Sequence, residues 1–64
     1  MRYNVFMVND NFLLLSIVNM KLRDNYSDLS SLCEEEGFDE EEVVNRLAEI
    51  GYVYNEEENA FKPL

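Results

Sequence analysis

The most apolar stretch of the chain runs from Phe12 to Leu22 and contains neither glycine nor proline. Asparagine and aspartate side chains precede it at positions 9–11, and such residues cap helix starts well. The pattern therefore predicts a first helix over residues 9–24.

This first helix is apolar around most of its circumference. A narrow polar stripe of Ser16, Asn19 and Arg23 separates two apolar flanks. One flank comprises Leu14, Leu15, Val18 and Leu22, and the other comprises Leu13, Ile17 and Met20. Such a helix needs cover on most sides. It is either the central helix of the fold or packs one flank against a second copy of the protein.

A second, shorter helix is predicted over residues 27–36. Ser27 is suited to cap its start, and Gly37 is suited to end it, because glycine adopts the left-handed conformation of a helix terminus at little cost. Its apolar face comprises Leu29, Leu32 and Cys33. The helix should therefore pack this face on the core.

A third helix over residues 39–50 has the clearest start signal. Asp39 stands three residues before a glutamate, which is the spacing of a capping box, and Phe38 with Val43 are placed as a hydrophobic staple. Gly51 should end the helix. Together the second and third helices have the size of a helix-turn-helix.

Residues 52–62 place β-type residues on both sides of an acidic loop flanked by asparagines, which predicts a β-hairpin. Pro63 should end its second strand. Residues 1–8 are either a short strand or a tail. The predicted fold class is mainly α, within α+β: residues 1–64 form one domain of three helices, the second and third arranged like a helix-turn-helix, with a C-terminal β-hairpin.

Charge is distributed unevenly along the 64 residues, whose net charge is −9. Residues 1–24 carry three basic and two acidic side chains, whereas residues 25–64 carry two basic and twelve acidic ones. An acidic surface repels nucleic acid and anionic membranes, so neither is expected as a direct partner. Excess acid also serves solubility alone.

The sequence predicts a protein of the cytoplasm. No apolar run approaches the ~20 residues of a membrane span. The chain has one cysteine, so it cannot form an internal disulfide, and a reducing compartment fits best.

The composition lacks most of the side chains that enzymes use. Without histidine, the chain has no imidazole for a general base, the usual zinc site or a catalytic triad. Both glycines are assigned to helix ends, so no phosphate-binding loop remains. Cys33 lies on an apolar face among acids that raise the pKa of a thiol, which favours a buried structural role over a nucleophile. No enzyme activity, cofactor or metal is expected.

Seven acids fall within nine positions on either side of Gly37. The acids at positions 39–42 lie at the start of a predicted helix, where the helix dipole favours negative charge. The acids at positions 34–36 lie at the end of a predicted helix, where the dipole disfavours it. One interpretation is a mimic of nucleic acid phosphates that inhibits a DNA- or RNA-binding protein, and the other is a solvated surface. A calcium loop would need different ligand spacing. This alternative acidic surface comprises Glu34, Glu35, Glu36, Asp39, Glu40, Glu41 and Glu42.

The polar stripe of the first helix is the other candidate surface. Simple exposure explains it, and so does a structural role in which Arg23 pairs with an acid of the second or third helix while Asn19 satisfies a main-chain group. The functional alternative is a contact patch for a peptide, a protein or a second subunit. The candidate interaction residues are Ser16, Asn19, Lys21, Arg23 and Tyr54.

The segment LLSIVNMKLRDNY, which spans residues 14–26, resembles a family of short bacterial proteins. Further matching positions are Leu29, Leu32, Cys33, Ile50, Gly51, Tyr52, Tyr54, Asn59 and Phe61. The family is the domain of unknown function 4250. The resemblance covers roughly residues 10–62, implies no known activity, and draws attention to Asn19, Lys21, Arg23 and Asp24.

These observations favour a small acidic, non-catalytic protein that acts as a protein-interaction module or accessory factor. Its partner is another protein or a second copy bound through an apolar flank of the first helix. The alternative is the acidic nucleic-acid mimic. A DNA-binding domain would need a local positive surface, and the only basic cluster is Lys21 with Arg23.

Overall fold

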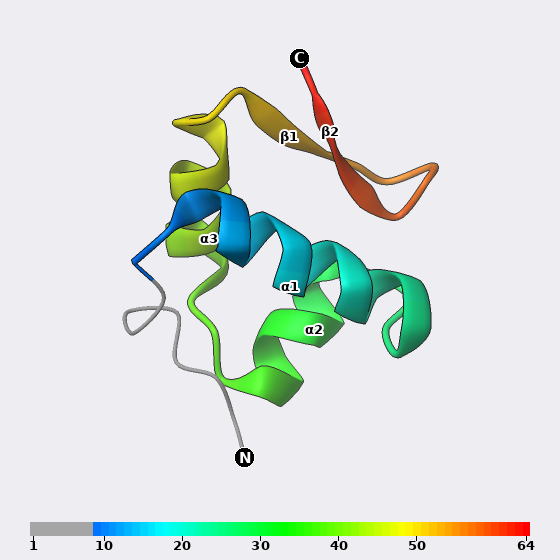
Figure 1. Ribbon diagram of the computed structural model, residues 1–64. Helices are drawn as coiled ribbons and strands as arrows, with labels where there is room; N and C mark the ends of the chain where they lie inside the picture. Colours follow the sequence, from blue (N-terminus) through cyan, green and yellow to red (C-terminus); the bar gives the residue numbers. More distant parts are fainter. Residues whose placement is uncertain (1–8) are drawn as a thin grey trace.

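The computed structural model describes residues 9–64, so the strand or tail predicted for residues 1–8 lies outside the described residues. The described residues form three helices followed by an antiparallel two-stranded hairpin, which confirms the predicted α+β class (Figure 1). The elements are α1 (Asn11–Asp24), α2 (Leu29–Glu36), α3 (Glu40–Ala48), β1 (Tyr52–Asn55) and β2 (Ala60–Pro63).

Helix α1 begins at Asn11 rather than at residue 9, because Asp10 is its N-cap. The Asp10 carboxylate accepts hydrogen bonds from the N–H groups of Phe12 at 2.8 Å and Leu13 at 3.4 Å. The last turn carries the basic residues Lys21 and Arg23, which complement the negative end of the helix dipole.

The N-cap of helix α2 is Asp28, one residue after the predicted Ser27, so the helix begins at Leu29. Asp28 Oδ1 accepts the main-chain N–H of Ser31 at 2.7 Å, and this hydrogen bond lowers the pKa of Asp28. Both residue types cap helices, but only the carboxylate of Asp28 reaches the third N–H of the helix. Gly37 ends the helix as predicted, in the left-handed conformation with φ of 76°.

Helix α3 begins where the sequence predicted and ends earlier. The Asp39 carboxylate caps it by accepting two N–H groups of the first turn, at 3.0 and 3.3 Å. The helix ends at Ala48 rather than at residue 50, because the chain tightens there: the N–H groups of Ile50 and Gly51 bond carbonyls three residues back. Gly51, with φ of 82°, then turns the chain into β1.

The hairpin contributes one large side chain to the core. In its register Tyr54 lies opposite Phe61, and the two ring centroids are 5.5 Å apart. Phe61 is buried, whereas Tyr54 is half-buried. Pro63 is the last residue of β2, so the hairpin runs one residue beyond the predicted 52–62.

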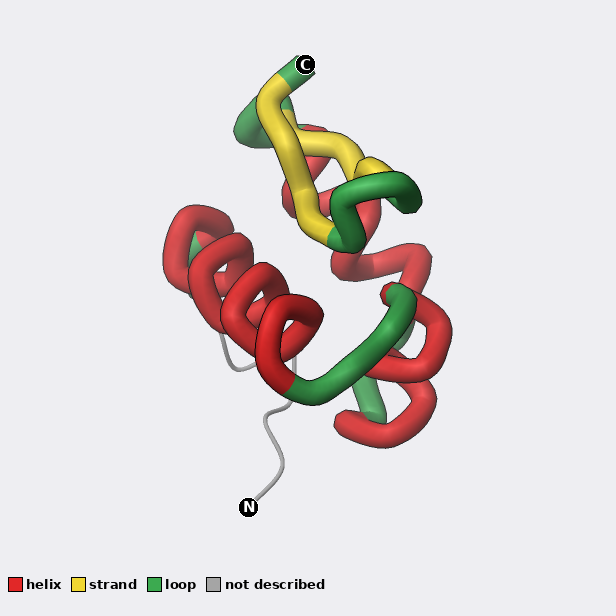
Figure 2. Tube along the Cα trace, turned by 90° about the vertical axis from the view of Figure 1, so that its right-hand side faces the viewer, coloured by secondary structure: helices red, strands yellow, loops and turns green. Residues whose placement is uncertain are grey.

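The hydrophobic core lies where the hairpin meets the helices. Figure 2 shows α1 on one side and the two shorter helices on the other, with the hairpin packed across them. All three helices, β2 and the α2–α3 turn contribute to the core, whose buried members are Leu14, Val18, Leu22, Leu29, Leu32, Cys33, Phe38, Val43, Leu47 and Phe61. Of the helices described, none has both the length and the apolar character needed to cross a membrane.

Candidate interaction site

Asn19 of α1 bonds the main chain of β2. Its side-chain nitrogen donates to the carbonyl of Phe61 at 3.1 Å, and its side-chain oxygen accepts the N–H of Phe61 at 2.7 Å. One amide thus pairs with both main-chain groups of a strand residue, as the next strand of a sheet would. Asn19 therefore has the structural role considered above, and it fastens the hairpin to α1.

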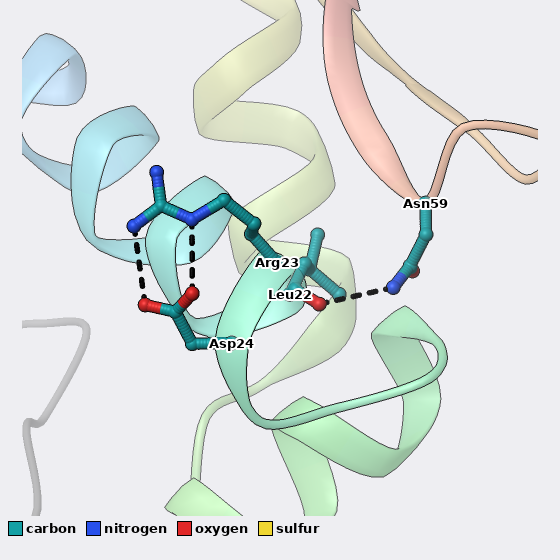
Figure 3. A network of polar contacts seen from close by, with 4 residues as sticks. All are labelled: Leu22, Arg23, Asp24 and Asn59. Carbon is teal, nitrogen blue, oxygen red and sulfur yellow. Dashed lines mark hydrogen bonds and ion pairs between the residues drawn. The ribbon is translucent and has the colours of Figure 1, made fainter.

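Asn59 makes a second link between the hairpin and α1. Its main chain has φ of 52°, a left-handed conformation that asparagine tolerates better than most residues. Its side-chain nitrogen donates to the carbonyl of Leu22 at 3.1 Å (Figure 3). The same nitrogen donates to the carbonyl of Tyr26 at 2.9 Å, and the side-chain oxygen accepts the Tyr54 hydroxyl at 2.6 Å. Because the carbonyls of a final helical turn lack partners within the helix, Asn59 completes the end of α1.

Lys21 joins α1 to α2. Its Nζ lies 3.3 Å from Glu36 Oε1, and each of the two side chains is only 15% exposed. The Tyr26 hydroxyl donates to the other oxygen of Glu36. Both oxygens of this sheltered carboxylate are therefore engaged, and Lys21 contributes to the packing of two helices.

Arg23 pairs with Asp24, its neighbour in the sequence, and not with an acid of α2 or α3 as the sequence suggested (Figure 3). The two nitrogen–oxygen distances are 2.9 and 3.1 Å. These hydrogen bonds raise the pKa of Arg23 and lower the pKa of Asp24. The physical reason for the correction is helical geometry: residues two apart lie on nearly opposite sides, so Lys21 faces α2 and Arg23 faces away.

Several acids on either side of Gly37 serve the fold itself. Asp39 caps α3, Glu36 receives Lys21, and Glu40 accepts the Ser30 hydroxyl at 3.1 Å. The remaining acids of the cluster are Glu34, Glu35, Glu41 and Glu42, of which the first three are exposed. Among residues 9–64, no three histidine, cysteine, aspartate or glutamate side chains gather as a metal site would require.

Cys33 is buried in the core, as the sequence indicated. Burial, with the nearby charges of Glu40 and Asp39, raises the pKa of Cys33 to about 11. The neutral thiol is therefore the form present near neutral pH, and it behaves as a small apolar side chain.

Large apolar side chains remain exposed on the outward side of α1. Phe12, Leu13 and Met20 are 59%, 53% and 47% exposed. Leu13 and Met20 are two helical turns apart and share one side of the helix. Together with the exposed Ser16 and Arg23, these three side chains define what we call the outer face of α1.

The outer face continues into a groove of about 730 Å³ between α1 and the hairpin. Met20, Ser16 and Arg23 belong to both, and Tyr52 lines the groove on the hairpin side. Of the candidate residues named from the sequence, Ser16 and Arg23 lie on the outer face. Asn19 lines the groove but is bonded to Phe61, and Lys21 and Tyr54 are bonded within the fold.

Sequence reasoning did not name Phe12, Leu13 or Met20 as site residues. Leu13 and Met20 belong to one of the two apolar flanks described from the sequence, and Ile17 of the same flank is half-buried against the core. The sequence did not indicate which of the two flanks would keep exposed side chains.

The fold and its surface define a small α+β domain with a buried and an exposed apolar side on one helix. Residues 8–61 match the family model described as Domain of unknown function (DUF4250), and the chain belongs to this family. The match confirms the resemblance carried by residues 14–26. No curated protein and no solved structure matches the chain.

Proposed function

We propose that this protein is a non-catalytic interaction module that binds a protein partner, or a second copy of itself, through the outer face of α1. The observation that carries the proposal is the exposure of Leu13, Met20 and Phe12 on a helix whose opposite side fills the core. Large apolar side chains exposed together on one face of a small protein are typical of interaction sites.

Burial energetics favour this face over the rest of the described surface. Complete burial of a large apolar side chain contributes roughly 1.5–3 kcal/mol. The half-exposed side chains on the outer face of α1 have realised only part of this free energy, and further burial would contribute the rest. The gain would be realised only when a partner removes the face from water.

Charge also favours this face. From Asn11 to Arg23 the helix contains no acidic residue, whereas most acids of the chain follow it. A partner that is itself acidic, including a second copy, would therefore meet the least repulsion at α1. The single buried cysteine supports a cytoplasmic setting for this interaction.

The acidic nucleic-acid mimic has less support. Such a mimic needs carboxylates that are free to present a phosphate-like strip, and Glu36, Asp39 and Glu40 are bonded to groups of the fold. These three bonds favour a structural role for part of the acidic cluster over a phosphate-like strip.

The test is affinity capture with the wild type, the double variant Leu13→Gln, Met20→Gln, and the control Val44→Gln. Val44 of α3 is 38% exposed, so the control removes a comparable apolar side chain from another helix. A partner should bind the wild type and the control and be lost from the double variant. Equal recovery with all three proteins would contradict the proposal.

Sedimentation equilibrium tests the second-copy form of the same proposal. A dimer built through α1 should give a mass that rises with concentration in the wild type and in Val44→Gln. The double variant should remain monomeric. A wild type that stays monomeric to millimolar concentration would exclude self-association and leave only a different protein as partner.

A further inference from the structure

The two outer edges of the hairpin differ in their main-chain hydrogen bonding. The edge of β2 is closed: Asn19 bonds both the N–H and the C=O of Phe61, and two residues later Pro63 has no N–H to offer. A strand edge whose main-chain groups are already bonded, or lack an N–H, cannot pair with another chain.

The edge of β1 is open. Tyr54 lies opposite Phe61, whose main-chain groups point away from β1 toward Asn19. The two residues therefore form a non-hydrogen-bonded pair, and the N–H and C=O of Tyr54 point away from β2. By the same alternation those of Tyr52 do so as well. No described residue forms a hydrogen bond with these main-chain groups.

A groove of about 410 Å³ lies beside Tyr54. It runs between the start of α2, the start of α3 and the loop that follows β1. Three of its lining residues are acids, namely Asp28, Glu40 and Glu56, and no lysine or arginine lines it. The hydroxyl-bearing residues Ser27 and Ser30 complete its polar wall.

We propose that the outer edge of β1 binds an extended peptide rich in lysine or arginine, which adds to the hairpin as a third strand. The main-chain groups of Tyr52 and Tyr54 supply the ladder hydrogen bonds. The negative charge of the groove selects basic side chains: Asp28 caps α2 and Glu40 accepts the Ser30 hydroxyl, but both line the groove together with Glu56. In an extended peptide alternate side chains point to one face, so basic residues at every second position reach the groove. This edge is separate from the outer face of α1, and neither proposal depends on the other.

The experiment is an NMR titration of the full chain with a synthetic peptide of alternating lysine and valine. The amide signals of Tyr52 and Tyr54 should shift and gain protection from hydrogen exchange, because their N–H groups become bonded. A second peptide with the same charge, methylated on the nitrogens that would pair with β1, should show no such protection and should bind at least about tenfold more weakly.

Two charge reversals in the same loop provide the matched comparison. Glu56 lines the groove and Glu57 does not, although both are exposed. Glu56→Lys should weaken binding roughly tenfold, and Glu57→Lys should weaken it less than about threefold, since only the first places a positive charge beside the bound lysines.

Three results would overturn the proposal. Equal weakening by both substitutions, or equal affinity for the methylated peptide, would show attraction to the overall negative charge instead of strand addition. Shifts confined to the outer face of α1 would place the peptide there. None of these results bears on whether a protein partner binds α1, which the Leu13→Gln, Met20→Gln variant tests separately.

Discussion

Leu13 and Leu14 are identical neighbours with opposite environments. Leu14 is completely buried and packs with Val18 and Leu22 on the inner side of α1, whereas Leu13 is 53% exposed beside Met20 on the outer face. Both residues are leucine, so the hydrophobicity of the side chain does not explain the difference. Their position on the helix does, because only the inner side faces the other helices and the hairpin. The two leucines thus mark two sides of one helix: an inner side that builds the core, and the outer face, for which we propose a binding role.

The largest expected effect comes from the same substitution made at the two neighbours. Leu14→Ala should lower the free energy of unfolding by about 2–5 kcal/mol, because it leaves a cavity in the core. Leu13→Ala should lower it by less than about 0.5 kcal/mol, as surface substitutions do. Urea unfolding followed by circular dichroism measures both. Similar losses would remove the distinction between the two sides of α1.

Next in size is the effect of removing the amide that links α1 to β2. Asn19→Ala leaves the N–H and C=O of Phe61 without their partner in a half-buried place, which should cost about 1–3 kcal/mol. Ser16→Ala, on the outer face, is the control and should be neutral. Hydrogen exchange of the Phe61 amide should quicken in the first variant only. An unchanged exchange rate would show that Asn19 does not hold the strand.

The smallest expected effect distinguishes the two ion pairs of α1. Glu36→Gln removes a pair in which both side chains are sheltered, so it should lower stability by about 1 kcal/mol, while the Tyr26 hydroxyl keeps an acceptor. Asp24→Asn removes the exposed pair with Arg23 and should have no measurable effect. Thermal unfolding at low and high salt checks this, because screening acts mainly on the exposed pair. A larger loss from Asp24→Asn would contradict the assignment.

The parts of the fold that the sequence predicted well depend on short-range signals. Gly37 and Asp39 specify a helix end and a helix start within a few residues, and the structure has both as predicted. The predicted helix boundary was wrong where two neighbouring residues are both suited to cap the helix, as Ser27 and Asp28 are. The chain after α3 forms hydrogen bonds to carbonyls three residues back before it reaches Gly51, and no residue type in this segment indicates that tighter turn.

The candidate site depended on contacts that are distant in the sequence. Asn19 and Phe61 are separated by 42 positions, and nothing in either local pattern pairs them. The ion pair between Lys21 and Glu36 also depends on the fold, because the packing of α1 against α2 decides which basic residue of α1 reaches α2. The sequence could therefore identify the polar stripe of α1 as unusual, but only the fold separates its structural member from its exposed ones.

The central claim is that the outer face of α1 is not needed for folding and is available to a partner. Urea unfolding of the double variant Leu13→Gln, Met20→Gln at low protein concentration tests it most directly. The free energy of unfolding should stay within about 0.5 kcal/mol of the wild-type value. A loss as large as that expected for Leu14→Ala would show that the chain itself covers this face, and would contradict the claim.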